Sequence, residues 1–320
     1  MTTQKLLLLD VDCGLDDAQA IMMALAATNV QLLGITCCHG NTTLDNVCRN
    51  VLRVLSVCQR TEIPVFRGAC SSLLGERLNA SSYHGKDGLG DVPDSNAPGL
   101  DKLQTEHAVN AMIRMVTEHV GQVSLIAVGP LTNVALAIKM DPTFSTKLKH
   151  LYIMGGNMEG IGNTTICGEF NFASDPEAAS IVLNQFVCPI YVATWEYCLH
   201  HSLPWEFFDD WINQGTEKAH FMKKITEHVG KYAKVKQGDK EVHTRTAFVS
   251  CDSFAVAAAI DETVVTEYMR CNVNVELQGA LTRGMMVLDR LNLQKKQNRA
   301  FVMMKCDIDK FKQYLMSALK

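Results

Sequence analysis

The sequence contains no hydrophobic run that could cross a membrane. Its apolar stretches all fall short of the roughly 20 residues that a membrane-spanning helix needs. The first of them, Leu6–Leu9, ends at Asp10 and is too short for the core of a signal peptide. We therefore expect a cytoplasmic protein without a membrane partner.

An excess of charge of one sign is also missing. The 320 residues carry 30 basic and 34 acidic side chains, so the formal net charge is −4 with neutral histidines. A chain without a basic excess has no electrostatic reason to bind a polyanion. We therefore expect no nucleic-acid partner.

Two sequence motifs with known chemistry are absent. The twelve cysteines are scattered and include no C-x-x-C pair. A structural zinc site or a disulfide framework therefore has little support, and we expect reduced thiols that are mostly buried. No glycine-rich dinucleotide fingerprint follows the first predicted strand, so nothing supports a nicotinamide enzyme.

What the sequence does contain is an alternation of strand and helix patterns. Apolar residues make up 47% of the chain and charged residues 20%, as in an ordinary globular protein. Short β-rich runs predict strands over Leu6–Val11, Val30–Cys37, Ile63–Phe66, Val123–Val128, Leu151–Met154 and Pro189–Ala193. Helical spacing predicts helices over Asp16–Ala27, 44–58, Ala108–Val120, Leu131–Ile138 and Pro176–Leu183. This order predicts a Rossmann-like α/β fold, an open and mainly parallel sheet flanked by helices.

The remaining segments predict a loop, a helical insertion and late strands. The stretch from about Gly75 to Leu103 is rich in Gly, Ser, Asp and Pro and is expected to be irregular. Residues Pro204–His243 are expected to form a helical insertion, followed by a helix over Asp252–Ile260. Late strands are expected over Met269–Leu277, Gly284–Leu288 and Arg299–Cys306, before an amphipathic helix that begins near Ile308. We interpret residues 1–320 as one domain.

Four aspartates lie close together after the first predicted strand. Asp10 and Asp12 are two positions apart, so both side chains point the same way if the strand continues. A turn at Gly14 would bring Asp16 and Asp17 back toward them. Carboxylates without neighbouring His or Cys ligands suit Ca²⁺ or Mg²⁺ better than zinc, and like charges this close favour a bound cation. Alternatively, Asp16 and Asp17 only cap the next helix.

The spacing D-x-D-x-G-x-D-D resembles the N-terminal signature of the inosine–uridine preferring nucleoside hydrolase family, with Cys13 where that family usually has Pro. Further motifs of the family follow in order: His39-Gly40-Asn41, His84-Gly85-x-Asp87-Gly88, Val128-Gly129-Pro130-Leu131-Thr132-Asn133, Met154-Gly155-Gly156, Glu169-Phe170-Asn171, Asp175-Pro176-Glu177-Ala178-Ala179 and Cys251-Asp252. The resemblance implies the nucleoside hydrolase fold. It also implies hydrolysis of ribonucleosides to ribose and free base, through an oxocarbenium-like transition state.

The resemblance further implies a Ca²⁺ site. Its ligands are Asp12, Asp17, Asp252 and the backbone carbonyl of Val128, with Asp10 supporting them from behind. Asp12 also accepts a proton from the attacking water, whose pKa the cation lowers. Taken alone, Asp252 is explained better as the N-cap of the following helix.

The same resemblance assigns a substrate pocket. The substrate-binding residues that it implies are Asp16, Asn41, His84, Met154, Asn163, Glu169, Phe170 and Asn171. Asn offers both a donor and an acceptor to a ribose hydroxyl, whereas ionised Glu only accepts. Taken singly, Met154 and Phe170 are as well explained by core packing, and Asn163 and His84 by solvated loops.

The chain departs from the family at the leaving group. Several members have His immediately before the last calcium-binding Asp, where it protonates the leaving base, and this chain has Cys251 there. A thiol with an ordinary pKa of about 8.5 is protonated at neutral pH but is a weak donor. Three possibilities stay open. Cys251 donates, His243 or another His of the helical insertion donates, or the base leaves with little help.

Two other functions agree with parts of the sequence. A catalytically weak relic would bind nucleosides or ribose without efficient turnover. The D-x-D of Asp10 and Asp12 also fits a haloacid-dehalogenase-like phosphatase, but that class disfavours Gly14 and does not account for Glu169 or Asn171. The family resemblance also implies a homodimer or a homotetramer.

Overall fold

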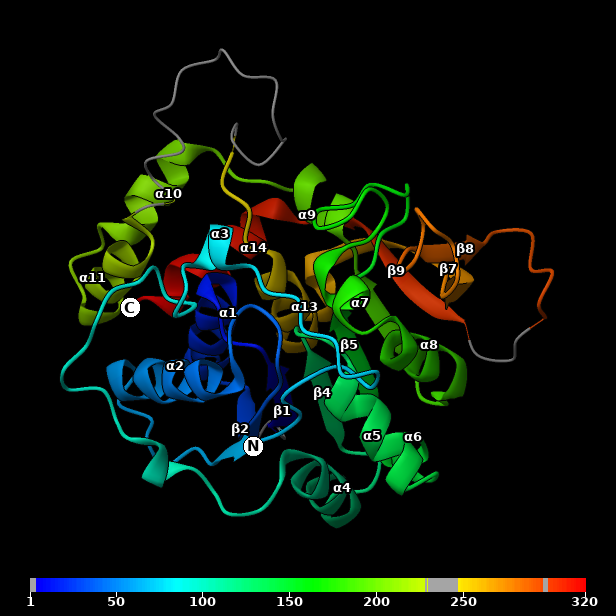
Figure 1. Ribbon diagram of the computed structural model, residues 1–320. Coiled ribbons are helices and arrows are strands. Elements are labelled where there is room, and N and C mark those ends of the chain that lie inside the picture. The colour runs from blue at the N-terminus through cyan, green and yellow to red at the C-terminus, as the bar shows by residue number, and fades with distance from the viewer. Residues whose placement is uncertain (1–3, 228, 230–246, 296–298) are drawn as a thin grey trace.

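The computed structural model describes residues 4–320 apart from 228, 230–246 and 296–298. Its centre is a nine-stranded sheet in the order β3-β2-β1-β4-β5-β6-β9-β7-β8 (Figure 1). The strands are β1 (Lys5–Val11), β2 (Val30–Cys37), β3 (Val65–Arg67), β4 (Val123–Ala127), β5 (His150–Met154), β6 (Ile190–Ala193), β7 (Val265–Val275), β8 (Met286–Asp289) and β9 (Ala300–Cys306). The helices are α1 (Leu15–Ala26), α2 (Leu44–Val57), α3 (Ser81–His84), α4 (Ala108–Glu118), α5 (Thr132–Met140), α6 (Phe144–Lys147), α7 (Phe170–Ser174), α8 (Pro176–Gln185), α9 (Trp195–His200), α10 (Trp205–Ile212), α11 (Glu217–Ile225), α13 (Cys251–Ile260) and α14 (Ile308–Ala318), with short 3-10 turns η1 (Leu100–Lys102) and η3 (Glu262–Val264).

The order of the strands reverses between β1 and β4. From β1 the chain proceeds to β2 and β3 on one side, and then returns to β4 on the other side of β1. The pairs from β3 through to β9 are parallel, whereas β7 pairs antiparallel with both β9 and β8. In open α/β sheets, ligands bind where the strand order reverses, at the carboxyl ends of the strands. The loops that carry Asp12 and Gly129 meet at this point.

Helices cover both faces of the sheet (Figure 1). α1, α13 and α14 pack against one another on one side, and α4, α5 and α8 pack on the other. Leu7 and Leu9 belong to the first core and Leu8 to the second, because successive side chains of a strand alternate between faces. A strand buried on both faces is apolar throughout, which is why this segment is recognisable in the sequence.

The predicted α/β sheet is confirmed, with two local corrections. The stretch Gly75–Leu103 is not wholly irregular, because it contains α3, whose last residue His84 is buried. β7 begins at Val265 rather than at Met269. Its first half has exposed polar residues, and its pairing with β9, a strand distant in sequence, makes this half a strand.

The other sequence predictions have mixed outcomes. The insertion after Pro204 contains helices α10 and α11, while its end at His243 lies outside the described residues. Eight of the twelve cysteines are buried, as expected. In the described part of the chain, no helix combines the length and the hydropathy that a membrane span requires. The division into a single domain over 1–320 stays a prediction.

Candidate active site

The turn after β1 places Asp12 against two glycines. A Cβ added at Gly40 would lie 2.0 Å from Oδ2 of Asp12, and one added at Gly129 would lie 2.9 Å from its Oδ1. The loops after β2 and β4 therefore approach Asp12 as closely as only glycine permits. The backbone N–H of Asn41 donates to Oδ2 at 2.8 Å, whereas Oδ1 is buried with no hydrogen-bond donor among the described residues.

Asp17 is fixed by the backbone at the start of α1. Its carboxylate accepts the backbone N–H of Gly14 at 2.8 Å and that of Asp12 at 3.2 Å. Nδ2 of Asn41 donates to the same carboxylate at 3.2 Å. Asp17 thus caps α1, as one of our interpretations predicted, and it also faces the aspartates described next. Gly14 is required for close approach rather than for an unusual turn, because a Cβ there would lie 2.4 Å from Nδ1 of His84.

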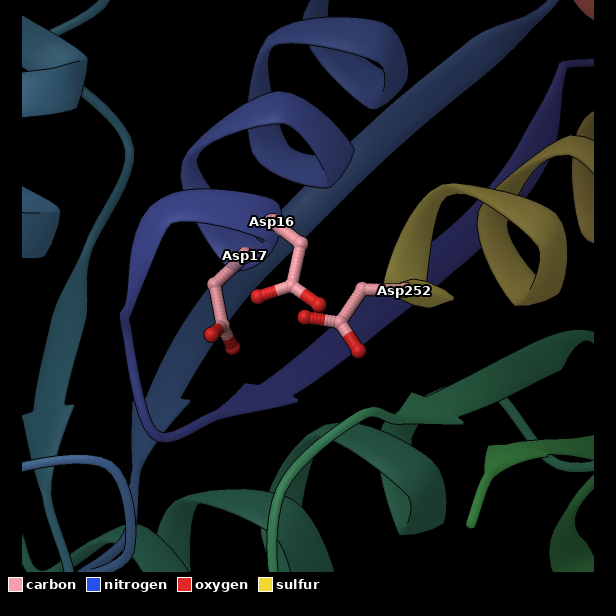
Figure 2. Close-up of side chains that lie close together, drawn as sticks. All are labelled: Asp16, Asp17 and Asp252. Atoms are coloured by element: carbon pink, nitrogen blue, oxygen red, sulfur yellow. The ribbon is translucent and has the colours of Figure 1, made fainter. Parts of the chain in front are cut away.

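Three carboxylates meet between α1 and α13. Oxygen atoms of Asp16, Asp17 and Asp252 all lie within 4.8 Å of one another. Figure 2 shows these carboxyl groups turned toward the space between the first turns of the two helices. α13 begins at Cys251 with Ser250 as its N-cap, so the interpretation of Asp252 as the N-cap is wrong. Asp252 instead lies in the first turn of the helix, facing the other two carboxylates.

Burial and repulsion between charges raise the pKa values of Asp12, Asp17 and Asp252. Burial, followed by the charge of Asp17, raises the pKa of Asp12 well above its ordinary value. Burial, followed by the charge of Asp16, likewise raises the pKa of Asp252 well above the usual range and that of Asp17 to about 7. Buried carboxylates that repel one another ionise together at neutral pH only when a cation offsets their charge.

The donor set fits a hard divalent cation. Oδ1 of Asp12 is a buried acceptor with no hydrogen-bond donor among the described residues. Asp12 belongs to the same turn as Asp17 and donates its backbone N–H to that carboxylate. The group of carboxylates contains no His or Cys within the described residues, and oxygen ligands are those that Ca²⁺ and Mg²⁺ require. The group contains Asp16, which the resemblance assigned to the substrate, and does not contain Asp12, which the resemblance assigned to the metal.

A pocket of about 570 Å³ opens beside the carboxylates. Its lining includes these residues predicted from the sequence: Asp16, Asn41, His84, Val128, Met154, Asn163, Glu169, Phe170, Asn171, Cys251 and Asp252. Asp12 and Asp17 lie behind the lining, next to Asn41. Pockets of this size hold small organic ligands. The structure thus brings together side chains that are spread over most of the sequence, whereas His243 lies outside the described residues.

Glu169 organises the polar end of this pocket. Its carboxylate caps α7 and accepts backbone N–H groups, including that of Asn171 at 2.9 Å and that of Gly156 at 2.7 Å. Burial raises its pKa to about 7, even though these hydrogen bonds favour the charged form. Asn171 in turn donates Nδ2 to the carbonyl oxygens of Val128 at 2.8 Å and Met154 at 3.1 Å. These bonds fix the ends of β4 and β5 relative to the pocket.

His84 and Cys251 both line the pocket. Nδ1 of His84 accepts the N–H of Leu15 at 3.0 Å, and the side chain is buried, so the interpretation as a solvated loop residue is wrong. Cys251 lies beside Cys198, and its pKa is well above the ordinary value because the two thiols are hydrogen-bonded and because the site is buried. Its thiol therefore keeps its proton at neutral pH.

Comparison with known proteins decides the family. The family model of the inosine-uridine preferring nucleoside hydrolases matches residues 7–313. The chain belongs to this family. It is 34% identical to an inosine-uridine preferring nucleoside hydrolase of Leishmania major, over 98% of this chain and 97% of that protein. It is 33% identical to a pyrimidine-specific ribonucleoside hydrolase of Escherichia coli, over 98% of both. A solved inosine-guanosine nucleoside hydrolase has a TM-score of 0.87 at 30% identity, over 99% of both chains.

Membership of the nucleoside hydrolase family confirms the predicted family, fold and enzyme class. As a nucleoside hydrolase the chain is a glycosidase, and the phosphatase alternative is wrong. Nucleoside hydrolases depend on a metal, and the cluster of Asp16, Asp17 and Asp252 is a group that could hold one.

The family motif that ends at Asn133 supports the acidic turn through hydrogen bonds to Asp10. Asn133 donates Nδ2 to Oδ1 of Asp10 at 2.9 Å and to the carbonyl oxygen of Cys37 at 3.0 Å. The hydroxyl of Thr36 donates to the same oxygen of Asp10 at 2.7 Å. Burial raises the pKa of Asp10 to about 7 in spite of these bonds. Asp10 therefore joins the carboxyl ends of β1, β2 and β4 and does not line the pocket.

A second buried network fixes the loop after β2. Nε2 of His39 lies 3.0 Å from the hydroxyl of Thr132, which donates its proton to Asp175 at 2.7 Å. Since that proton is used, Nε2 of His39 is the donor to Thr132. Burial lowers the pKa of His39 to about 4, so the ring is neutral. This chain of bonds holds Gly40 against Asp12.

Sequence reasoning missed the aromatic wall of the pocket. Tyr83, Trp195, Trp205 and Phe248 all line it. Two of the three tryptophans of the chain therefore face one cavity. The available signal was the position of the two tryptophans, between β6 and the Cys251-Asp252 motif, where a binding residue is as plausible as a core residue.

Proposed function

We propose that the chain hydrolyses the N-glycosidic bond of ribonucleosides with the aid of a bound Ca²⁺. One observation carries the proposal: a buried carboxylate group lies at the wall of a pocket that also has amide groups and aromatic rings. Amides suit ribose hydroxyls, and aromatic rings suit the faces of a base. The names of the relatives include purine and pyrimidine nucleosides, and we propose no preference between them.

The residues that would hold Ca²⁺ are Asp12, Asp17, Asp252 and the carbonyl oxygen of Val128, with Asp16 adjoining them. When bound, the cation would lower the pKa of a water and bind ribose hydroxyls. Asp12 is suited to receive the proton of that water, because its Oδ2 is fixed by Asn41 and its Oδ1 has no donor in the part of the chain that the structure describes. We assign Asp12 as the general base.

The ribose would be held by Asn163, Glu169 and Asn171. Because Asn171 uses Nδ2 on two backbone carbonyls, it would present its side-chain oxygen to a ribose hydroxyl. The carboxylate of Glu169, once ionised, also stabilises positive charge that develops on the ribosyl ring. An iminoribitol cation should accordingly bind more tightly than ribose.

Ribose release tests this proposal directly. A reducing-sugar assay with inosine and uridine should detect turnover in the presence of Ca²⁺ and none after chelation. Asp12→Asn should lower turnover by roughly a hundredfold or more, the effect of losing a general base. Asp210→Asn, on the exposed face of α10, is the matched control and should have no effect. Absence of ribose release from every nucleoside, together with saturable binding of ribose analogues, would instead identify a weakly catalytic relic.

We further propose that the thiol of Cys251 donates to the leaving base. Cys251→Ala should lower kcat on nucleosides by about tenfold, a modest loss that suits a weak donor. The same variant should hydrolyse p-nitrophenyl riboside at the wild-type rate, because p-nitrophenolate leaves without a proton. Cys70→Ala, at an exposed thiol, serves as the control. Equal rates of Cys251→Ala and wild type on nucleosides would mean that the base leaves without help from this residue.

The oligomeric state and the cellular location of the protein remain predictions from the sequence. We propose a homodimer or homotetramer in the cytoplasm, and light scattering of the purified protein would give its mass in solution.

A further inference from the structure

Part of the pocket wall comes from a segment between β3 and α4. Residues 79–94, which we call the covering loop, supply Asn79, Ser82, Tyr83 and His84 to the pocket lining. Within the loop, Gly90 donates its backbone N–H to the carbonyl oxygen of His84 at 2.8 Å. The later part of the loop, residues 85–94, is therefore joined directly to the part that lines the pocket.

One face of α2 holds this later part. The hydroxyl of Thr42, just before the helix, donates to the carbonyl oxygen of Lys86 at 2.7 Å. Asn50 donates Nδ2 to the carbonyl oxygens of Asp87 at 2.7 Å and Cys13 at 3.0 Å. Asn46 donates Nδ2 to the hydroxyl of Thr42 at 3.1 Å. Positions 46, 50 and 53 recur at intervals of three or four and therefore lie on one side of the helix. The contacts of α2 thus connect the covering loop to the turn that carries the catalytic aspartates.

Arg53 provides the charged contact. Its side chain is 8% exposed. Nη2 donates to the carbonyl oxygen of Val92 at 3.0 Å, and the guanidinium lies 3.8 Å from the carboxylate of Asp87 and 3.7 Å from that of Asp94. It also lies 5.8 Å from the centre of the Phe221 ring of α11. A buried guanidinium with two carboxylates is weakly screened by salt.

We propose that Arg53 is a positioning residue that keeps the covering loop closed over the nucleoside pocket and thereby sets substrate affinity. The proposal rests on the proposed function. Arg53 does not line the pocket. If the loop opens part of the time, the apparent dissociation constant rises by the inverse of the closed fraction, for substrate and transition-state analogue alike. Loss of Arg53 should therefore raise KM without lowering kcat, because every bound complex still has a closed loop.

The test compares Arg53→Met with wild type in the full chain. Methionine keeps the apolar stem without the guanidinium, and the partly exposed Asp87 and Asp94 remain hydrated. We expect the KM for inosine and the Ki of an iminoribitol cation to rise together by about tenfold, with kcat within about twofold of wild type. Arg49→Met, at an exposed arginine one turn earlier in α2, is the matched control and should change neither. A fall in kcat at unchanged KM would overturn the proposal, as would an equal rise in KM for Arg49→Met.

Limited trypsin digestion gives a readout that needs no catalysis. Lys86 is exposed within the covering loop, so cleavage after it reports loop opening. Cleavage should be several times faster in Arg53→Met than in wild type, and the iminoribitol cation should slow it. If Arg53→Met folds poorly, Asp94→Asn provides the second variant, with a smaller rise in KM of about two- to threefold expected. An unchanged cleavage rate would overturn the role of Arg53, whereas absence of ribose release by wild type would overturn only the proposed function.

Discussion

Replacing Asp252 by alanine should produce the largest loss of metal affinity of any single substitution proposed for this chain. Asp252 comes from α13, whereas Asp16 and Asp17 come from α1, so its removal would leave no carboxylate ligand from α13. Loss of partners that only orient metal ligands already costs roughly 10–100-fold in affinity. Loss of a ligand itself should exceed that range. Calorimetric titration with Ca²⁺ would measure the loss, and ribose release at saturating nucleoside would measure its effect on turnover.

The same substitution also separates a metal role from a structural one. The metal-free Asp252→Ala protein should be at least as stable as metal-free wild type, because one of the mutually repelling buried carboxylates is gone. Asp210→Asn should leave both metal affinity and turnover unchanged. Calcium affinity equal to that of wild type in Asp252→Ala would contradict the assignment of Asp252 as a ligand.

The second large effect concerns the pH dependence of stability in the absence of metal. Burial raises the pKa of Asp10, Asp17 and Glu169 to about 7 in the folded protein, from 3.8 for the aspartates and 4.5 for the glutamate. Between about pH 4 and pH 7 the folded state therefore binds more protons than the unfolded state. The free energy of unfolding must then fall as the pH rises through this window. The Tm of the metal-free protein should drop between pH 5 and pH 8, on the order of 5 °C or more.

Calcium should reverse this trend, because ionised carboxylates bind the cation and protonated ones do not. The increase in Tm on adding Ca²⁺ should thus be larger at pH 8 than at pH 5, and binding near pH 6 should release protons. Calorimetry in buffers with different ionisation enthalpies counts those protons. Asp10→Asn should flatten the pH dependence of the metal-free protein, since its amide still accepts the bonds from Thr36 and Asn133. A metal-free Tm that rises from pH 5 to pH 8 would contradict the raised pKa values.

The stretches with strong local signals were predicted well from the sequence. The run Leu6–Leu9 is apolar on both faces, and the aspartates that follow it mark the carboxyl end of a strand. The first helices and strands were equally visible, because their apolar periodicity is local. The family motifs supplied the remaining site residues, and most of those line the pocket in the structure. Periodicity failed at α3 and the start of β7, where distant contacts decide the backbone conformation.

The sequence by itself determined the order of helices and strands, the acidic turn after β1 and the family. Each of these depends on short spans of residues, or on motifs with fixed spacing. Only the tertiary structure decided which carboxylates lie close together, that Asp252 faces α1, and that Arg53 contacts the covering loop. The physical reason is that burial, repulsion between charges and ion pairing depend on distances in space, and the groups involved come from segments far apart in the chain.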